Sequence, residues 1–389
     1  MQKTTEKKDT DLNDIMTMAD NPEVIAFSGG LPDPALFPEK ALAQAYQKAI
    51  SQDRGVFQYH SAQGNLQLRQ QLANRCQKDG QINAQAENVL ITQGGQQAIT
   101  LIAEMVLSKG CGIAVESPTY LGALNVFDQY QPNYYQIPLD ENGMEIDKLA
   151  EQLELHPEIK LIYTVPDFQN PTGTSMSLTR RKQLADLAAK YQVYVLEDSP
   201  YRDLTYTGSQ LPTIKSFDQT GHVIFISSFS KILSPALRTG WVIAASDVIG
   251  KLTELKAASD LCSPEITQRS ICCYLTDNSL DQHIAQLCQN YQKKQKVMLG
   301  AIKDYFPSWA KATSPKGGFF IWVELPEKLD AGKLLIESVL PKYQVCYVPA
   351  SAVYAGASKK NGFRLSYVGN SPDKIVEGIK RLGTCLKHV

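Results

Sequence analysis

The sequence lacks the features that mark a membrane protein, a secreted disulfide scaffold or a metal-binding domain. No apolar run approaches the length of a membrane span, and the first twenty residues lack the apolar core of a signal peptide. Eight cysteines and five histidines are scattered, with no CxxC pair and no metal-ligand spacing. These absences predict a cytoplasmic protein with reduced thiols, no metal and no membrane contact.

The balance of charge excludes a further set of partners. With 39 basic and 40 acidic side chains the net charge is −1, which gives no bulk attraction to nucleic acid or to an anionic membrane. Hydrophobic residues make up 43% of the chain and charged residues 20%, as in ordinary soluble globular proteins. A length of 389 residues is enough for two domains. The sequence is therefore typical of a soluble two-domain protein without a nucleic-acid partner.

Short β-rich runs alternate with helical stretches between Asn88 and about Ala245. The clearest strands are expected at 89–92, 112–116, 161–165, 193–197, 223–226 and 241–244, with helices such as 96–108 and 178–191 between them. This alternation predicts an α/β domain whose largely parallel sheet is covered by helices. Residues 46–285 should form this large domain, whereas 1–45 and 286–389 should form a smaller, discontinuous α+β domain with an N-terminal arm. A long amphipathic helix over 281–303 should bridge the two.

One stretch, residues 227–241, carries the strongest chemical signal. Its Lys231 follows an apolar strand, so it should leave the sheet at a strand's carboxyl end, where open α/β sheets bind ligands. An amine near that apolar edge can be desolvated, which lowers its pKa and favours a nucleophile. Arg238, together with the hydroxyls of Ser228 and Ser230, suits a phosphate. The ordinary alternative is a solvated loop lysine.

Three other expected strands also end in side chains that suit one ligand. After the first strand, Gly95 and Gln96 lie in a glycine turn that opens a helix, and its free amides suit a phosphate. After the next strand, Tyr120 could stack on a planar ring. After the third, the Asn170 amide could donate to a ring oxygen. Each residue also has an ordinary explanation, as a helix connection, a packed surface tyrosine or a turn.

Asp198 follows the strand expected at 193–197, and Tyr201 comes three residues later. A carboxylate at this place could cap a helix, or it could meet a pyridine nitrogen and keep it protonated, which makes the ring an electron sink. Tyr201 could then donate to the phenolic oxygen of the same ring. Asp198 and Lys231 leave the ends of separate strands, so only the fold can bring them together.

Taken together, these motifs resemble those of class I/II aminotransferases of fold type I, which use pyridoxal 5'-phosphate (PLP). In order they are Gly-Gly-Gln, Pro-Thr-Tyr, Asn-Pro-Thr-Gly, Glu-Asp-x-Pro-Tyr, Ser-x-Ser-Lys and Arg-x-Gly-Trp. The resemblance covers residues 23–385. It is closest to the branch that includes 2-aminoadipate, kynurenine and aromatic aminotransferases, because of the segments 29–32 and 58–64. It implies a mostly parallel seven-stranded sheet in the large domain and a smaller α+β domain.

The resemblance also implies a role for each candidate residue. Lys231 would hold PLP covalently and move the proton during catalysis, and Gly30 would line the substrate pocket. The others would contact the ring (Asp198, Asn170, Tyr201, Tyr120), the phosphate (Gly95, Gln96, Ser228, Ser230, Arg238 and, from the neighbouring subunit, Tyr59) and the substrate (Arg364, which would bind the α-carboxylate, and Asn170). The role of Tyr59 makes a homodimer with shared active sites part of the expectation.

These roles predict a transaminase that moves an amino group from an L-amino acid to a 2-oxo acid such as 2-oxoglutarate, with ping-pong kinetics. Family members that bind an acidic side chain often place an arginine in the N-terminal arm, whereas no arginine precedes Arg54 here. We therefore expect a neutral donor, aromatic or aliphatic. Two alternatives stay open. One is a PLP-dependent lyase or decarboxylase, and the other is a PLP-binding regulator, for which residues 1–22 are too few to form a helix-turn-helix domain.

Overall fold

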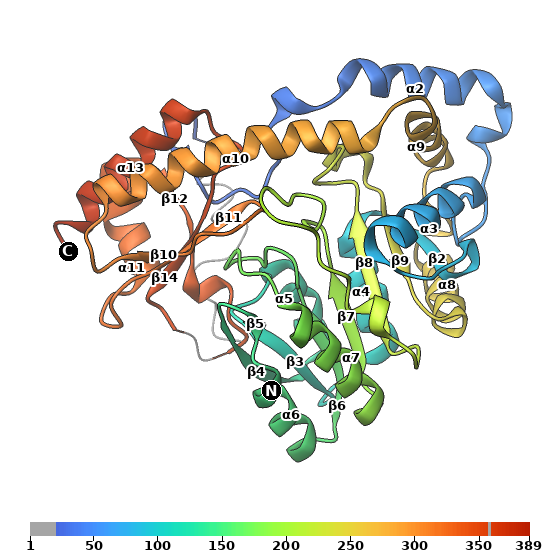
Figure 1. Ribbon diagram of the computed structural model, residues 1–389, viewed down its shortest axis with the longest axis horizontal. Helices are drawn as coiled ribbons and strands as arrows, with labels where there is room; N and C mark the ends of the chain where they lie inside the picture. Colours follow the sequence, from blue (N-terminus) through green and yellow to red (C-terminus); the bar gives the residue numbers. More distant parts are fainter. Residues whose placement is uncertain (1–20, 357–358) are drawn as a thin grey trace, which may run out of the picture.

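An eight-stranded mixed sheet lies at the centre of the computed structural model, which describes residues 21–356 and 359–389 (Figure 1). In spatial order its strands are β2 (Val89–Thr92), β9 (Gly240–Ile243), β8 (Val223–Ser228), β7 (Tyr194–Asp198), β6 (Ile159–Thr164), β3 (Gly112–Ser117), β4 (Asn133–Asp140) and β5 (Gly143–Met144). The neighbouring strands from β8 to β4 are parallel. β9 runs antiparallel to both of its neighbours, β2 and β8, and β5 runs antiparallel to β4. The predicted α/β class with a mostly parallel sheet is confirmed.

The sheet has one strand more than the seven expected. The additional strand is β5, which has two residues and pairs with β4 at the edge of the sheet. β4 is itself not among the six strands located by sequence, because Ile137 is the only buried residue of its eight. An edge strand of this kind has no continuous apolar run, which is the signal that locates the buried strands. The six predicted strands lie within two residues of β2, β3, β6, β7, β8 and β9.

Helices precede, connect and follow the strands of the large sheet. They are α3 (Leu66–Gly80), α4 (Gly94–Val106), α5 (Leu121–Phe127), α6 (Ile146–Leu155), α7 (Leu178–Tyr191), α8 (Ser246–Asp260) and α9 (Glu265–Asp277). The bounds of α7 agree with the prediction, and the Ser177 hydroxyl caps its first turn by accepting from the Arg180 amide. α4 begins two residues earlier than predicted, because Gly94 adopts a φ of +78° and turns the chain directly from β2 into the helix.

A smaller antiparallel sheet lies beside the large one, in the order β10 (Lys311–Ala312), β11 (Phe320–Glu324), β14 (Gly362–Ser366) and β13 (Val348–Pro349). A short parallel pair joins the beginning of the described chain to this region, namely β1 (Ile25–Ala26) with β12 (Val345–Cys346). The remaining helices are α2 (Glu39–Gln52), α10 (Leu280–Tyr305), α11 (Ala331–Leu334), α12 (Leu340–Tyr343) and α13 (Pro372–Leu386).

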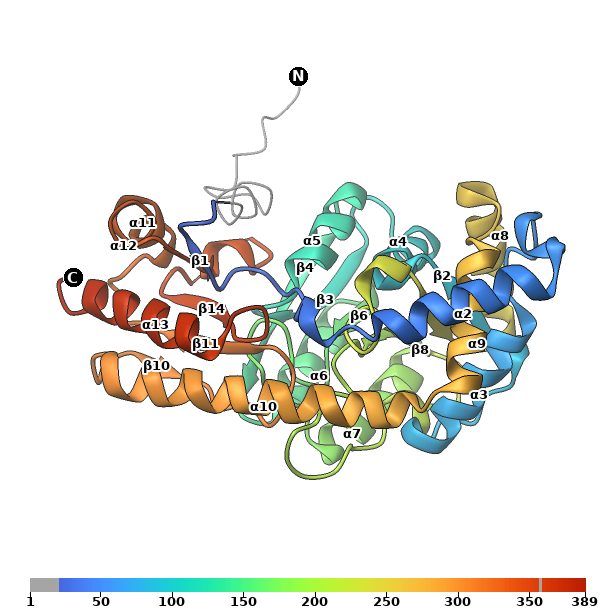
Figure 2. The same ribbon diagram turned by 90° about the horizontal axis from the view of Figure 1, so that it is seen from above.

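The long helix α10 connects the two parts of the chain, as the amphipathic pattern over 281–303 predicts. Figure 2 shows it running from the neighbourhood of α9 to α13, along the side of both sheets. The pairing of β1 with β12 supports a small domain built from both ends of the chain. The domain limits at residues 45 and 286 stay a prediction.

Three expectations concern features that the described residues do not test directly. Most of the predicted N-terminal arm lies outside the described residues, which begin at 21. Within the described part of the chain, no helix combines the length and apolar character needed to cross a membrane. In the same part, no three histidine, cysteine or acidic side chains are grouped so that they could hold a metal ion.

The core of the large sheet explains where its functional residues can lie. β2 and β9 are buried along their whole length, and the inner parts of β3, β6, β7 and β8 are buried as well. Strands buried on both faces leave no room there for a solvated ligand. Because β3, β6, β7 and β8 are parallel, their polar carboxyl ends meet at one edge. That edge is where the candidate residues gather.

Candidate active site

Lys231 lies just beyond the carboxyl end of β8, and its side chain points toward the loop that follows β1. Its Nζ donates a hydrogen bond to the Gly30 carbonyl (2.9 Å) and lies 5.8 Å from the centre of the Phe319 ring. Burial and, after it, the nearby cations of Arg364 and Arg238 lower the pKa of Lys231 from 10.5 to about 8. The amine is therefore largely neutral at mildly alkaline pH, which is the form that acts as a nucleophile or base.

Asp198 ends β7 and is buried, and its carboxylate lies near the Lys231 amine. The Tyr163 hydroxyl donates to Asp198 Oδ2 (2.8 Å) from the adjacent strand β6. Burial raises the pKa of Asp198 to about 7, although the Tyr163 hydrogen bond and the charge of Lys231 act in the opposite direction. Among the described residues no cationic side chain forms an ion pair with this carboxylate. A buried carboxylate in this situation is stabilised by a ligand that carries a proton on nitrogen.

An open cradle lies where α4 begins, beside Arg238. Arg238 Nη2 donates to the Gln93 carbonyl (3.0 Å), and its guanidinium packs so closely on Gly94 that a Cβ there would lie 2.8 Å from Nη2. Gly95 instead faces open space, since apart from its own helix and chain neighbours no described atom lies within 4 Å of the place where a Cβ would be. Free amides at the start of a 13-residue helix, an open space and a guanidinium form a site for an anion.

The hydroxyl groups of this cradle come from the end of β8, whereas the Gln96 side chain turns away. Ser228 Oγ accepts a hydrogen bond from the Ser230 amide (3.4 Å), and both serines are buried. Gln96 Nε2 donates to the Gly122 carbonyl (2.7 Å), so that side chain is bound to α5. The backbone amide of Gln96, in the first turn of α4, is the group best placed for an anion, which refines the expectation for this residue.

Arg364 lies on β14 of the small sheet and reaches across to the large one. Its Nη1 donates to Asn170 Oδ1 (2.8 Å), its Nη2 donates to the Ser28 carbonyl, and the guanidinium carbon lies 4.2 Å from the centre of the Phe320 ring. Its Nε is buried and has no hydrogen-bond partner in the part of the chain that the structure describes. Burial lowers the pKa of Arg364 to about 10. A buried guanidinium with an unused N–H is suited to the carboxylate of a ligand.

Two tyrosines complete the cluster. Tyr201 is buried between the rings of Phe319 and Phe320, with centroid distances of 5.5 and 5.6 Å. Its hydroxyl is hydrogen-bonded to Asn170, and burial raises its pKa above the ordinary value. The Tyr120 ring packs against Gly122, where a Cβ would overlap it at 2.4 Å. Burial has the largest effect on the pKa of Tyr120 and raises it. The nearby carboxylate of Asp198 raises it further.

The structure therefore brings most of the predicted residues together, with one exception. No contact links Tyr59 to the cluster within the described part of a single chain, and 75% of its side chain is exposed. Sequence reasoning also missed three neighbours of the cluster. Tyr163 could have been noticed as the tyrosine within an apolar strand, and Phe319 and Phe320 as an aromatic pair that follows two glycines.

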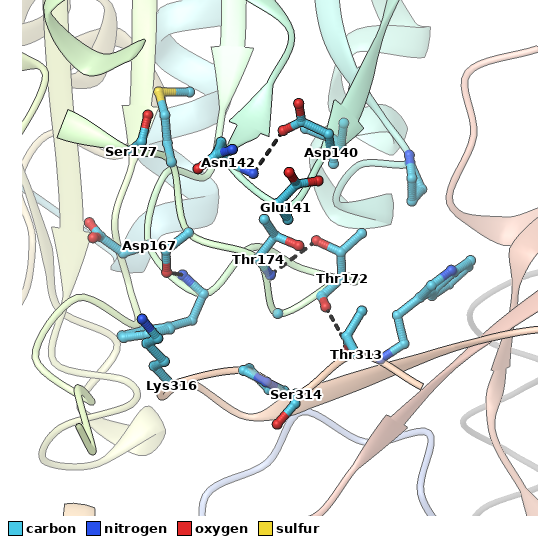
Figure 3. A pocket seen from close by; sticks show the side chains of 18 of the residues that line it. Asp140, Glu141, Asn142, Asp167, Thr172, Thr174, Ser177, Thr313, Ser314 and Lys316 are labelled. Carbon is cyan, nitrogen blue, oxygen red and sulfur yellow. Dashed lines mark hydrogen bonds between the residues drawn. The ribbon is translucent and has the colours of Figure 1, made fainter. Parts of the chain in front are cut away.

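A cavity of about 730 Å³ opens near the cluster, between loops of the large and small sheets (Figure 3). Its lining includes Asp140, Glu141, Thr174, Ser177, Ser314 and Lys316. Thr313 Oγ1 donates to the Thr172 carbonyl (2.9 Å) at its inner wall. Lys231, Asp198 and Arg364 do not line it. The cavity is therefore a space between the two sheets that is separate from the candidate active site.

Known proteins resemble the chain along nearly its whole length. Residues 22–382 match the family Aminotransferase class I and II. Aromatic-amino-acid aminotransferase 1 of Thermococcus litoralis is 37% identical, with 98% of this chain and 92% of that protein covered. The 2-aminoadipate transaminase of Thermus thermophilus is 32% identical, with 97% and 93% covered. The crystal structure of Pyrococcus horikoshii kynurenine aminotransferase superimposes with a TM-score of 0.93 at 37% identity, covering 98% of this chain and 95% of that one.

A parallel sheet with a lysine, a carboxylate and an anion cradle at its carboxyl edge defines a PLP-dependent enzyme of fold type I. The chain belongs to the class I and II aminotransferases and is a PLP-dependent transaminase. The geometry agrees with this cofactor. The open space at Gly95 suits its phosphate, the unpaired carboxylate of Asp198 suits its pyridine nitrogen, and the amine of Lys231 lies beside both.

The lowered pKa of Lys231 predicts how the cofactor-free protein takes up PLP as the pH changes. Because the neutral amine is the nucleophile, the rate should rise with pH and level off above about 8, rather than rise toward the ordinary value of 10.5. Stopped-flow absorbance can measure this rate. In Arg364→Met the midpoint should move to higher pH, since a cation that lowers the pKa is gone. A midpoint near 10.5 in the unmodified protein would contradict the assignment.

Proposed function

We propose that this transaminase takes its amino group from a neutral L-amino acid, aromatic or aliphatic, and passes it to a 2-oxo acid such as 2-oxoglutarate. The observation that carries the proposal is the buried Nε of Arg364, which has no hydrogen-bond partner among the described residues and belongs to a guanidinium near the Lys231 amine. This guanidinium is ready to bind the α-carboxylate that amino acids and 2-oxo acids share. The relatives named above are aminotransferases, which favours amino transfer over the lyase alternative.

Each residue of the cluster takes one task in this proposal. Lys231 holds PLP covalently, and Asp198 holds a proton at the pyridine nitrogen. The other contacts are Asn170 and Tyr201 to the ring oxygen, Tyr120 to the ring face, and Gly95, the Gln96 amide, Ser228, Ser230 and Arg238 to the phosphate. When bound, PLP supplies a ring that accepts electrons from the substrate Cα.

The protein's own groups then control the substrate. Arg364 fixes the α-carboxylate, and Gly30 lines the space beside it, where a Cβ would lie 3.0 Å from the Phe320 ring. As a free amine, Lys231 Nζ would take the proton from the substrate Cα and later return a proton, since its lowered pKa lets it serve as base and acid. The packed rings of Phe319 and Phe320 exclude water from this space.

Two observations support a neutral donor. No arginine precedes Arg54, and the described loop residues beside Lys231 are uncharged, namely Gly29, Gly30 and Leu31. A neutral side chain can enter such surroundings without a charged partner. The related proteins named above include one for aromatic donors and one for 2-aminoadipate, so the choice of donor needs a direct test.

The test is an absorption spectrum of the PLP-loaded protein after addition of single L-amino acids without an acceptor. We expect neutral aromatic and aliphatic donors to bleach the yellow cofactor band and release a 2-oxo acid. Their rates should be at least about tenfold above those of acidic amino acids whose side chains are one methylene longer or shorter than that of glutamate. D-amino acids serve as the matched control. Bleaching by acidic donors alone would contradict the proposed donor class. Loss of carbon dioxide or of a side-chain fragment would point to a lyase, and a band that shifts without bleaching would point to a regulator.

We also propose a homodimer in which Tyr59 reaches the phosphate of the neighbouring subunit. Three large side chains support it, because Phe57, Tyr59 and Leu261 are 69%, 75% and 61% exposed in the single chain. Contiguous apolar side chains at this exposure mark interaction sites, and Phe57 and Tyr59 are two residues apart in the chain. A cytoplasmic location accompanies this proposal, supported by eight cysteines that form no disulfide.

Mixing two variants tests the shared site. Lys231→Ala and Tyr59→Ala should each have low activity at limiting PLP. A refolded equal mixture should regain about a quarter of the unmodified activity, because half of the dimers are mixed and each of these has one complete site. If Tyr59 served its own subunit, no dimer in the mixture would have a complete site and nothing would be regained.

A further inference from the structure

Glu116 is a buried carboxylate that none of the roles above uses. It precedes the last residue of β3 and is 2% exposed. It accepts three hydrogen bonds, from Thr164 Oγ1 (2.5 Å), from the Val165 amide (3.2 Å) and from Gln169 Nε2 (3.0 Å). Burial raises the pKa of Glu116 to about 7, and the nearby carboxylate of Asp198 acts in the same direction. Burying a carboxylate costs free energy, and satisfied hydrogen bonds from such a group can fix the position of the segments that donate them.

Gln169 uses every hydrogen-bonding position of its side chain. Nε2 donates to Glu116 Oε2 and to the Pro118 carbonyl (2.8 Å), while Oε1 accepts from the amide and the hydroxyl of Thr172 (2.8 Å each). The orientation of this amide is fixed, because the Thr172 backbone N–H can only donate and therefore must face the oxygen. The amide nitrogen must then face two acceptors, which are Glu116 and Pro118.

Gln169 connects two loops, and these loops carry Asn170 and Tyr120, the residues proposed to contact the PLP ring. Gln169 directly precedes Asn170, and Thr172 closes the same loop behind it. Pro118 lies two residues before Tyr120, in the loop that leaves β3. One side chain therefore sets the separation between Asn170 and Tyr120, and Glu116 sets the orientation of that side chain.

We propose that Glu116 is a positioning residue for the cofactor cleft: through Gln169 it holds the loops of Asn170 and Tyr120 at the separation that the PLP ring requires. The inference rests on the ring contacts proposed for these two residues. It assigns to Glu116 the task of a hydrogen-bond acceptor, and not that of a charge acting on Asp198. A substitution that keeps an acceptor but removes the charge should preserve the first task and abolish the second.

The variants Glu116→Gln and Glu116→Met distinguish the role of a hydrogen-bond acceptor from that of a charge. In Glu116→Gln the new amide oxygen can accept from Val165 and Gln169, while the new NH2 donates to the Thr164 hydroxyl, which can turn to accept it. Binding of PLP to the cofactor-free chain should stay within about threefold of the unmodified value. In Glu116→Met the acceptor is gone, so PLP should bind at least about tenfold more weakly. Amide hydrogen exchange in residues 165–174 of the cofactor-free chain should quicken only in Glu116→Met.

Glu197 offers a matched control on the neighbouring part of the sheet. It is also buried, burial raises its pKa to about 7, and it accepts from the amides of Ile214 (2.9 Å) and Lys215 (2.8 Å). Glu197→Met should lower the melting temperature about as much as Glu116→Met does, yet leave the PLP dissociation constant within about twofold of the unmodified value. Equal weakening of PLP binding in both methionine variants would reduce the effect to general destabilisation and overturn the proposal.

Two further outcomes complete the test. If Glu116→Gln weakened PLP binding as much as Glu116→Met, the charge of Glu116 would be the important property and the positioning role would be wrong. If Glu116→Met failed to fold, Gln169→Glu would decide, because its carboxylate would face Glu116 and the Pro118 carbonyl and should weaken PLP binding about tenfold. If even the unmodified chain bound no PLP, the proposed ring contacts would fail, whereas hydrogen exchange would still report whether Glu116 holds the loop.

Discussion

Replacing Lys231 with alanine is expected to lower kcat for amino transfer by at least about 10³-fold, since a positioned general acid and base contributes about 10² to 10⁴ and the covalent hold on PLP is lost as well. Lys231 is the lysine whose charge acts on Asp198, and Arg364 and Arg238 also act on its amine. Lys231→Arg should lose as much activity, although it keeps a cation of similar length, because a guanidinium is not deprotonated at these pH values.

Three measurements test whether Lys231 itself binds PLP covalently and acts as the base. Reduction with borohydride followed by peptide mass spectrometry should find PLP attached to the unmodified protein at residue 231 and nowhere in Lys231→Ala. The alanine variant should still bind PLP without a covalent bond, because the cradle at Gly95 and Arg238 is unchanged. A small primary amine added to the solution should restore part of its activity by supplying the missing base. The assignment would be wrong if Lys231→Ala kept more than about a tenth of the unmodified kcat without added amine.

The carboxyl ends of the strands were predictable because they obey one simple rule. Parallel strands buried on both faces read as apolar runs, and the polar residue after each run must lie at the common edge. That rule places Asn170, Asp198 and Lys231 at one edge from the order of the residues alone, and the hydrogen bonds and pKa shifts found there agree with it. β4 is not recognised by the same rule, because its residues are mostly half-exposed.

The rest of the site depends on pairings that no local pattern contains. Tyr163 meets Asp198 because β6 and β7 align in a particular register, with Tyr163 opposite Leu196. Arg364 meets the Ser28 carbonyl across 336 residues of sequence, through the packing of the small sheet on the first loop. The direction of a side chain is equally absent from the sequence pattern, since the Gln96 side chain binds the Gly122 carbonyl instead of remaining in the cradle. Such contacts follow from the packing of the whole chain.

The second large effect is expected at Arg364. Arg364→Lys should lower kcat/KM for amino acids and 2-oxo acids by about 100-fold, because two charge-assisted hydrogen bonds to the α-carboxylate contribute roughly 3 kcal/mol together. A lysine ammonium is a point charge and cannot reproduce the two parallel N–H groups of the guanidinium. The Nε of Arg364 has no partner within residues 21–356 and 359–389, whereas its Nη2 donates to the Ser28 carbonyl. A bound carboxylate can use the first group at once and compete for the second.

A pair of substrates shows whether Arg364 binds the carboxylate or only supports its neighbours. An amino acid should be compared with the primary amine that has the same side chain and no carboxylate. In Arg364→Lys the amino acid should lose its advantage over the amine, while the slow reaction of the amine stays nearly the same. Arg180→Lys is the matched control, because Arg180 makes a two-pronged contact with Asp140 away from the cluster and its loss should leave the preference intact. If Arg364→Lys slowed the amine and the amino acid equally, the contact of Arg364 with Asn170 would explain the loss, and the carboxylate would have to bind elsewhere.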